Sequence, residues 1–310
     1  MRRLVVLSLG AAALGAVALG AVIAWPVGSA PAPIAPVGNV ERGAYLARAS
    51  GCIACHSDFA GGGAPLAGGA PLVTDFGTFH PPNITTDPEA GIGDWTAESF
   101  AMAVRQGVSP DGTPYFPAFP YPFYADFSDQ DIADLWAAFQ TVPPVAEPAP
   151  PHEVSFPFDQ RWGLKLWRAA YFYDPKSGPV EGRSEAWNRG RELVRGATHC
   201  GACHTPRNLA GGRDLGAIFA GNARLPGGSK APPITPKALA KGGWTVPTLA
   251  YALASGLTPS GDAFGGSMAE VVREGTRFLT QQDREAMALF LLDADEASED
   301  LASDTGPAKD

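Results

Sequence analysis

The stretch Cys-Ile-Ala-Cys-His at residues 52–56 returns as Cys-Gly-Ala-Cys-His at residues 200–204, and these two segments contain every cysteine of the 310-residue chain. Two thiols three residues apart can each add to one vinyl group of a haem, and the histidine that follows can bind the iron as the proximal ligand. A redox dithiol or a zinc site would have no use for a histidine directly after each pair. We therefore predict two covalently attached haem c groups, held by Cys52, Cys55, His56, Cys200, Cys203 and His204.

The similarity between the two halves extends well beyond the motifs. Trp95 matches Trp244 and Gly107 matches Gly256, each pair at the same offset along the chain. Apolar spacing and capping residues place helices at the same points of both halves. The predicted elements are helices at residues 42–46 and 189–194, helices capped by Thr96 and Thr245, and closing helices at 131–139 and 283–292. Each half therefore has the plan of a small all-α cytochrome c domain.

We accordingly predict an all-α protein with two tandem cytochrome c domains of class I type. The predicted divisions are 1–37 (signal peptide or membrane anchor with an Ala/Pro tether), 38–145 (domain 1), 146–184 (linker), 185–297 (domain 2) and 298–310 (acidic disordered tail). Two aromatic stretches of the linker, at 156–162 and 167–173, are too apolar for a free linker. We expect them to pack across the surface between the domains.

The N-terminus and the charge balance restrict the compartment and the partners. Arg2 and Arg3 precede an apolar run from Leu4 to Trp25, which is typical of an export signal and is long enough to remain as a membrane anchor. The sequence favours the anchor over a cleaved signal, and both place the protein in the periplasm. The 32 acidic and 23 basic residues give a net charge of −9, which argues against nucleic acid as a partner.

The sixth ligands of the two irons differ. Met268 lies in a loop before a predicted helix, and a methionine there is well placed as the distal ligand of haem 2. The same offset places Phe119 at the equivalent position of the first half, and phenylalanine cannot bind iron. Haem 1 is then either five-coordinate or bound by another residue. The candidates for that residue are Met102, His80, His152 and His199, and the arginines predicted to pair with haem propionates are Arg105, Arg161 and Arg207.

Several segments resemble the cytochrome c subunits of bacterial membrane-bound alcohol, aldehyde and gluconate dehydrogenases. The matching segments are 83–87, 91–95, 117–121, 203–208 and 265–272, and the resemblance covers residues 39–297. It implies an electron relay from a dehydrogenase subunit to ubiquinone, a cytochrome or a terminal oxidase. Two features depart from that family. Its subunits usually carry three haem domains where this chain has two motifs, and its first domain usually has methionine where Phe119 stands.

Two functions remain open from the sequence. The first is a dihaem electron-transfer protein, in which the iron supplies the chemistry and no general acid, base or nucleophile is needed. The second is a haem enzyme with an open coordination site at haem 1, acting on a small molecule such as peroxide or a sulfur oxyanion. Only the substitution at Phe119 favours the second.

Overall fold

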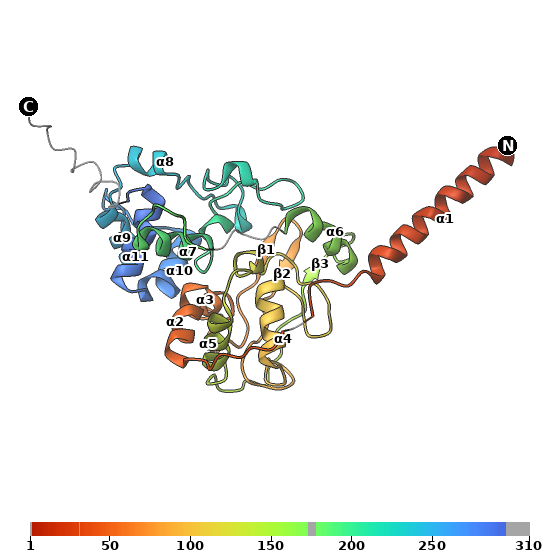
Figure 1. The fold of residues 1–310 in the computed structure, drawn as a ribbon, viewed down its shortest axis with the longest axis horizontal. Helices are drawn as coiled ribbons and strands as arrows, with labels where there is room; N and C mark the ends of the chain where they lie inside the picture. The colour runs from red at the N-terminus through yellow and green to blue at the C-terminus, as the bar shows by residue number, and fades with distance from the viewer. Residues whose placement is uncertain (1, 31, 173–177, 296–310) are drawn as a thin grey trace, which may run out of the picture.

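The computed structural model describes residues 2–30, 32–172 and 178–295, and it is mostly helical (Figure 1). Its α-helices are α1 (Arg2–Ala24), α2 (Val40–Ala49), α3 (Cys52–Cys55), α4 (Ala97–Ala101), α5 (Asp129–Phe139), α6 (Arg161–Tyr171), α7 (Glu185–Arg195), α8 (Pro236–Lys241), α9 (Val246–Ser255), α10 (Gly266–Glu274) and α11 (Gln281–Leu292). Shorter helical segments are the π-turn η1 (Met102–Gln106) and the 3₁₀ turns η2 (Tyr121–Phe123), η3 (Cys200–Ala202), η4 (Leu215–Ala217), η5 (Pro226–Gly228) and η6 (Thr276–Phe278). The predicted acidic tail at 298–310 lies outside the described residues.

Two helical units repeat one arrangement. In the first unit, which we define as α2 to α5, the helix before the motif crosses the closing helix; in the second unit, α7 to α11, the same crossing recurs. A glycine stands at each crossing. A Cβ atom on Gly43 would overlap the carbonyl group of Asp134, and one on Gly190 would overlap that of Ala286. The absence of a side chain therefore lets each helix pair approach to backbone contact.

An arginine beside each glycine binds the closing helix of its unit. Arg42 forms ion pairs with Asp131 and Asp134. Arg189 donates from Nε and Nη2 to both carboxylate oxygens of Asp283, at 2.9 and 3.0 Å. Such two-pronged contacts fix orientation as well as distance. They hold the repeated crossings in register.

The predicted helices are present, with small shifts at their ends. Thr96 and Thr245 cap α4 and α9, each in a reciprocal capping box with the residue three positions on. The closing helices α5 and α11 begin two residues before the predicted starts, because the caps are Ser128 and Thr280. The apolar periodicity located these helices, and the capping side chains set their first residues.

A small antiparallel sheet was not predicted, so the description all-α is correct only as mostly helical. Its strands are β1 (Leu72–Thr74), β2 (Gly77–Phe79) and β3 (Glu153–Val154), in the order β1-β2-β3. The tight turn between β1 and β2 is stabilised by Thr74, whose hydroxyl donates to the carbonyl of Gly77 at 2.8 Å. β3 comes from the predicted linker, so two strand residues from a distant segment complete the sheet. Three-residue strands carry too little periodicity to be detected in sequence.

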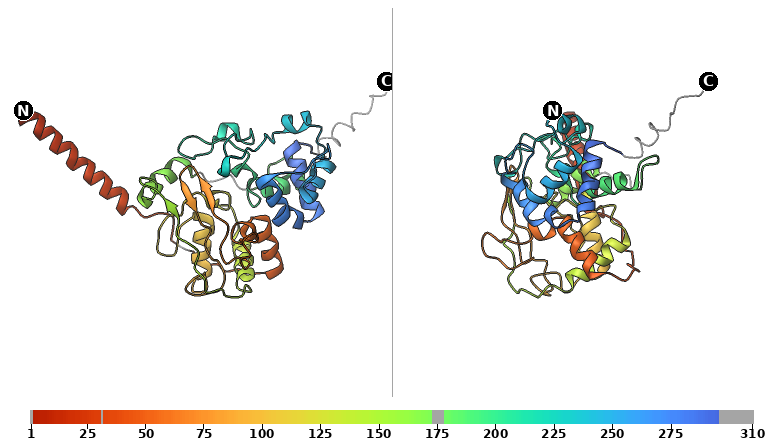
Figure 2. Two further views of the ribbon diagram at one scale, coloured as in Figure 1. Left: turned by 180° about the vertical axis from the view of Figure 1, so that it is seen from behind. Right: turned by 90° about the vertical axis from the view of Figure 1, so that its left-hand side faces the viewer.

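The two units pack directly against each other (Figure 2). The hydrophobic core of the second unit includes Ala49 of α2, and Tyr45 and Leu46 of the same helix pack on it. The hydroxyl of Tyr45 also donates to Asp283 Oδ2 at 2.6 Å. A helix of the first unit therefore forms part of the core of the second.

The linker helix α6 contacts both units through Arg161 of the 156–162 stretch and Trp167 of the 167–173 stretch, although Phe156 and Phe158 of the first stretch are exposed. Arg161 donates to the carbonyl of Pro114 in the first unit at 2.9 Å. Trp167 donates from Nε1 to the carbonyl of Ala210 in the second unit at 2.8 Å. Tyr173, at the end of that stretch, lies outside the described residues.

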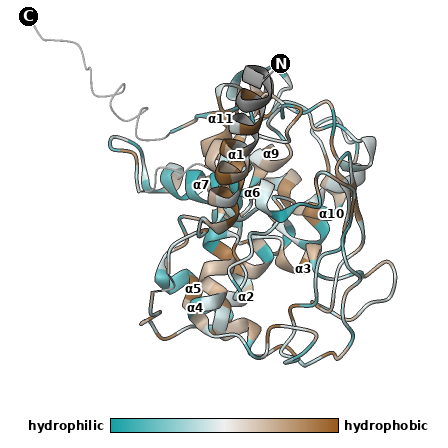
Figure 3. Ribbon diagram, turned by 90° about the vertical axis from the view of Figure 1, so that its right-hand side faces the viewer, coloured by the Kyte–Doolittle hydropathy of each residue, from teal (hydrophilic) through white to brown (hydrophobic). Residues whose placement is uncertain are grey.

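Helix α1 projects from the body of the protein (Figure 1) and is mainly apolar (Figure 3). At its C-terminal end, the ammonium group of Lys165 on α6 donates to the carbonyls of Ile23 and Trp25, both at 2.6 Å. Among the described residues, no helix combines the length and the hydropathy that crossing a membrane requires.

Replacing the crossing glycine of the second unit tests its role. We expect Gly190→Ala to lower the free energy of unfolding by about 1–3 kcal/mol, because the added methyl group forces the helices apart. Gly163→Ala on α6 is the matched control, since a Cβ there meets open space; it should be neutral or stabilise by about 0.4–1 kcal/mol. Chemical denaturation of the haem-loaded protein measures both. Equal stability of the two variants would contradict a close crossing at Gly190.

The contacts of Asp283 predict a pH-dependent contribution to stability. Burial alone raises the pKa of Asp283, but the hydrogen bonds from Arg189 and Tyr45 outweigh burial and lower the pKa below its usual value. The carboxylate then stabilises the fold above its unfolded-state pKa of ~3.9, and this contribution is lost as the pH falls through the lower folded-state value.

We therefore expect Asp283→Asn to cost about 1.5–3 kcal/mol at pH 7, the range for hydrogen bonds to charged groups. The difference from the unsubstituted protein should shrink as the pH falls through the acidic range. Denaturant titrations at a series of pH values measure it, and a difference that stays constant down to the lowest pH would refute the assignment.

Candidate haem-attachment sites

The first motif lies in a tight turn after α2. That helix ends at Ala49, and Gly51 then adopts a left-handed conformation with a φ of +69°. Glycine populates this region at no steric cost, so the chain can reverse sharply here. The next residues form α3 (Cys52–Cys55), and His56 ends it. The turn thus places both thiols and the imidazole within one helical turn of each other.

The second motif repeats this turn with one difference. After α7, His199 occupies the position equivalent to Gly51 and is also left-handed, with a φ of +36°. The segment Cys200–Ala202 then forms a 3₁₀ turn, and the backbone N–H of His204 donates to the carbonyl of Cys200 at 3.0 Å. A histidine in this region of backbone space is strained, and this conformation was not predicted from the residues around it.

Each motif histidine is oriented by a proline carbonyl. The Nδ1 atom of His56 lies 2.7 Å from the carbonyl oxygen of Pro82, and that of His204 lies 2.7 Å from the carbonyl oxygen of Pro232. A carbonyl only accepts hydrogen bonds, so the proton resides on Nδ1 and the lone pair on Nε2 is available. Metal-bound histidines are held in this way, with the second ring nitrogen donating to a fixed acceptor. Both sites therefore fit a haem iron.

Burial keeps the imidazoles neutral, as an iron ligand must be. Desolvation lowers the pKa of both His56 and His204, against a smaller opposite effect of the hydrogen bond to the proline carbonyl. At neutral pH no proton therefore occupies Nε2, and its lone pair is available to bind iron.

The thiols do not have the character of a redox dithiol. Although Cys55 has accessible surface, protein surrounds it at longer range, and this desolvation raises its pKa to about 11. Burial likewise raises the pKa of Cys52 to about 12 and that of Cys200 to about 11. Redox-active Cys-x-x-Cys pairs instead have a thiol whose pKa is lowered. The protonation state of these cysteines thus argues against thiol–disulfide exchange.

Met268 lies at the start of α10, partly buried, and packs against the core of the second unit. That core includes Leu249 and Leu253 on α9, the helix equivalent to α4. Met287 on α11, by contrast, is fully buried within the same core. These positions are compatible with Met268 as the distal ligand and with Met287 as a packing residue.

The equivalent region of the first unit is aromatic. The ring of Phe119 lies 6.1 Å from the ring of Tyr115 and 5.9 Å from that of Tyr124. Met102 is buried, whereas Tyr251, its match in the second unit, is 59% exposed. Met102 opens a π-turn where α9 continues as a regular α-helix. The repeat therefore breaks on this side of the first unit, and its sixth ligand stays a prediction.

The three histidines considered as replacement ligands have other contacts. The backbone N–H of His80 donates to Nδ1 of His152 at 3.2 Å, and its Nε2 atom lies 3.3 Å from a carboxylate oxygen of Glu153. The ring of His152 packs on Phe79. These two histidines lie where β3 joins the first unit. His199 lies between the two motif turns, with its ring against Gly51.

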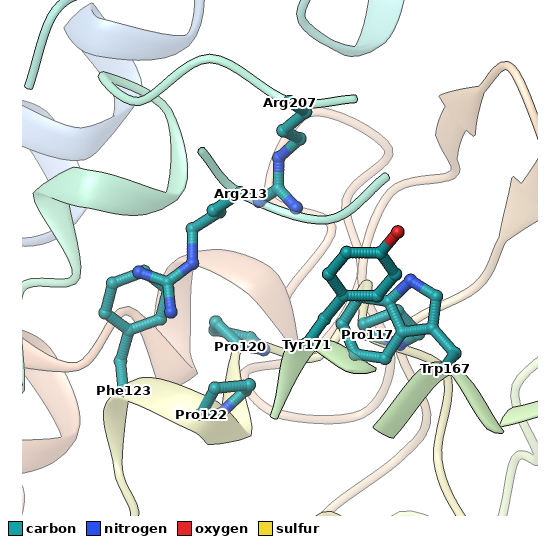
Figure 4. Close-up of a pocket in the computed structure, with 8 residues that line it drawn as sticks. All are labelled: Pro117, Pro120, Pro122, Phe123, Trp167, Tyr171, Arg207 and Arg213. Carbon is teal, nitrogen blue, oxygen red and sulfur yellow. The ribbon is translucent and has the colours of Figure 1, made fainter. Parts of the chain in front are cut away.

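The arginines predicted to bind propionates also have contacts within the chain. Arg105 donates to the carbonyl of Phe127 at 2.7 Å. Arg207 donates to the carbonyls of Ala202, inside the second motif, and of Gly211. Figure 4 shows its guanidinium in a pocket between α6 and the two units, close to that of Arg213. Arg207 is thus the candidate that lies beside a motif, and its role toward a propionate stays a prediction.

The proline acceptors were missed in the sequence, although a signal existed. Pro-Asn-Ile-Thr at 82–85 matches Pro-Pro-Ile-Thr at 232–235, one residue out of step with the offset that relates the two tryptophans. An unequal loop length between motif and proline hid the match. In the structure both segments return the chain to the motif histidine.

Comparisons with known proteins agree with this geometry. The cytochrome c family matches residues 40–139. The chain is 42% identical to the "Diheme cytochrome c-type" protein of Cereibacter sphaeroides over 82% of its own length and 85% of that protein. This chain belongs to the family of c-type cytochromes. It is therefore a haem c protein, and the first attachment motif, at residues 52–56, lies within the matched residues. The relatives give no support to the alternative of a haem enzyme acting on a small molecule.

Other relatives of this cytochrome are named as subunits of dehydrogenases. The chain is 38% identical to the "Gluconate 2-dehydrogenase cytochrome c subunit" of Pantoea cypripedii, over 84% of its own length and 61% of that protein. It is also 38% identical to the "Alcohol dehydrogenase (quinone), cytochrome c subunit" of Gluconobacter oxydans, over 81% of its own length and 54% of that protein. The cytochrome thus spans little more than half the length of these subunits.

Two methionines of the second unit allow a matched test of the distal ligand. We expect Met268→Leu to lower the midpoint potential of one haem on the order of 100 mV, within the ~0.8 V range over which axial ligands act, and to convert that haem to a high-spin spectrum. Met287→Leu should change neither, because Met287 only fills the core. Redox titration followed by absorption measures both variants. A low-spin Met268→Leu protein with an unchanged potential would exclude this ligand.

Proposed function

We propose that this cytochrome is a dihaem electron relay, built from two tandem cytochrome c domains at residues 38–145 and 185–297. It takes electrons from a dehydrogenase subunit and passes them to a further redox protein of the respiratory chain. The observation that carries the proposal is the repeated site: in both units a Cys-x-x-Cys-His turn has its imidazole held by a proline carbonyl at 2.7 Å. The names of the relatives support the dehydrogenase as donor.

The chain's own residues would hold and tune the two groups. Cys52 and Cys55 in the first domain, and Cys200 and Cys203 in the second, would form the thioether links. His56 and His204 would present Nε2 to the irons, with their ring planes fixed by Pro82 and Pro232. Met268 would complete the second site. Bound haem supplies one-electron chemistry, and the protein contributes orientation, exclusion of water and the distance between sites.

The same proposal includes export from the cytoplasm, because haem is attached to cysteines outside it. Arg2 and Arg3 at the start of α1, followed by its apolar residues, have the pattern of an export signal, and the resulting location is the periplasm. Mass spectrometry of the N-terminus of the exported protein distinguishes a retained membrane anchor from a cleaved signal.

Haem counting tests the dihaem assignment directly. Full-length protein produced with the haem-attachment machinery should carry two haems per chain. Replacing both cysteines of one motif by alanine (Cys52→Ala with Cys55→Ala, or Cys200→Ala with Cys203→Ala) should leave one. Haemochrome absorbance per chain and intact mass give the count, and reductive titration should deliver one electron for each haem. Two haems in either double variant would show that the motif is not the attachment site.

A further inference from the structure

The two attachment turns face each other across the contact between the units. Helix α10 of the second unit lies beside α3 of the first (Figure 3). The first attachment turn therefore lies against the second unit, although the second motif begins 148 positions further along the chain.

The residues that precede the two motifs are in contact. Gly51 and His199 occupy equivalent positions, and both have left-handed backbones. A Cβ atom on Gly51 would lie 3.4 Å from Cε1 of His199, so the imidazole rests against the first turn. The ring of His199 thus reaches from one turn to the other.

Tyr124 of the first unit also takes part in this contact between the turns. Its hydroxyl donates to the carbonyl of Ser50 at 2.7 Å and lies 3.4 Å from Nδ1 of His199. The two rings meet edge to face, with centroids 5.8 Å apart and planes at 89°. Tyr124 is only 3% exposed, and His199 is partly buried. Ser50 and His199 each lie within two residues of the first cysteine of a motif.

We propose that Tyr124 and His199 are positioning residues that fix the separation and orientation of the two attachment turns, and thereby set the rate of electron transfer between the haems. The inference rests on the proposed dihaem function. The step moves one electron: the iron of one motif is oxidised from the ferrous to the ferric state while the other is reduced from ferric to ferrous. No bond forms or breaks, and no proton is required.

The strain at His199 supports a role beyond filling space. A non-glycine residue with a φ of +36° costs free energy, and glycine at the same position would not. The first unit has glycine at this position, so the turn itself does not need a side chain. What the histidine adds is the ring that reaches Gly51 and the hydroxyl of Tyr124.

The contact also provides a short connected route between the motifs. From Cys52 the chain leads through Gly51 to the Ser50 carbonyl, then by the 2.7 Å hydrogen bond to Tyr124 and by the 3.4 Å contact to His199, which is covalently joined to Cys200. Only two non-covalent steps separate the backbones of the two motifs. Loss of the hydroxyl removes both of these steps and leaves only the direct contact of the His199 ring with Gly51.

Two substitutions test this proposal in the full-length, two-haem protein. Tyr124→Phe removes only the hydroxyl, and His199→Gly removes the imidazole while relieving the strained backbone. Tyr115→Phe is the control, because the ring of Tyr115 packs on Phe119 within the same loop region. After a flash reduces one haem, absorption spectroscopy follows the redistribution of the electron between the two. We expect a several-fold slower redistribution in Tyr124→Phe and His199→Gly and an unchanged rate in Tyr115→Phe.

Redistribution at the rate of the unsubstituted protein in either variant overturns the proposal. A purely structural role would lower the melting temperature without slowing the electron, so thermal unfolding is measured in parallel. Should one substitution prevent haem attachment, the other decides. Haem counting beforehand distinguishes a failure of the dihaem function from a failure of the positioning role. Fewer than two haems in the unsubstituted protein contradicts the dihaem function. Two haems with unaltered kinetics in the variants contradicts only the role of Tyr124 and His199.

Discussion

The close crossing of two helices at a glycine is the constraint on which each unit depends. At Gly43 and at Gly190 the opposite helix presents a backbone carbonyl where any side chain would stand. Helices that touch at the backbone have little freedom to slide or rotate, because close packing leaves one good fit. The arginine before each glycine then fixes the rotation through carboxylates of the closing helix. This pair of crossed helices, which we call the frame, positions the segments that follow the first helix of each unit.

The attachment turns are the first segments that the frame positions. The helix before the motif ends three positions before the first cysteine in the first unit and five positions before it in the second. A left-handed residue then turns the chain, and a distant proline carbonyl fixes the imidazole. Frame, turn and acceptor together determine where Nε2 of each histidine lies. The two units achieve this with different loops, so the frame and the acceptor, rather than the loop sequence, define the site.

Much of this could be predicted from local sequence, and the remainder could not for physical reasons. Helix positions, caps and motif chemistry are encoded within a few residues, as the capping boxes at Thr96 and Thr245 illustrate. The contact between Tyr45 and Asp283 joins residues 238 positions apart, and no periodicity reports such a pair. The π-turn at Met102 could not be predicted from the sequence either, because one extra residue in a helical turn leaves the amino-acid composition unchanged.

The units differ at positions that lie outside the crossed helices. Phe119 stands where the second unit has Met268, a π-turn stands where α9 is regular, and His199 stands where the first unit has Gly51. The rings that Phe119 contacts are those of Tyr115, Tyr121 and Tyr124, whereas Gly43 faces Asp134 and Pro82 faces His56. The distal side of one site can therefore change while its proximal side and the partner site keep their geometry. In a relay of two haems this separation matters, because direction requires unequal potentials whereas speed requires a fixed distance. In the proposed relay, one chain would satisfy both demands by varying the distal residues and by sharing a core between the units.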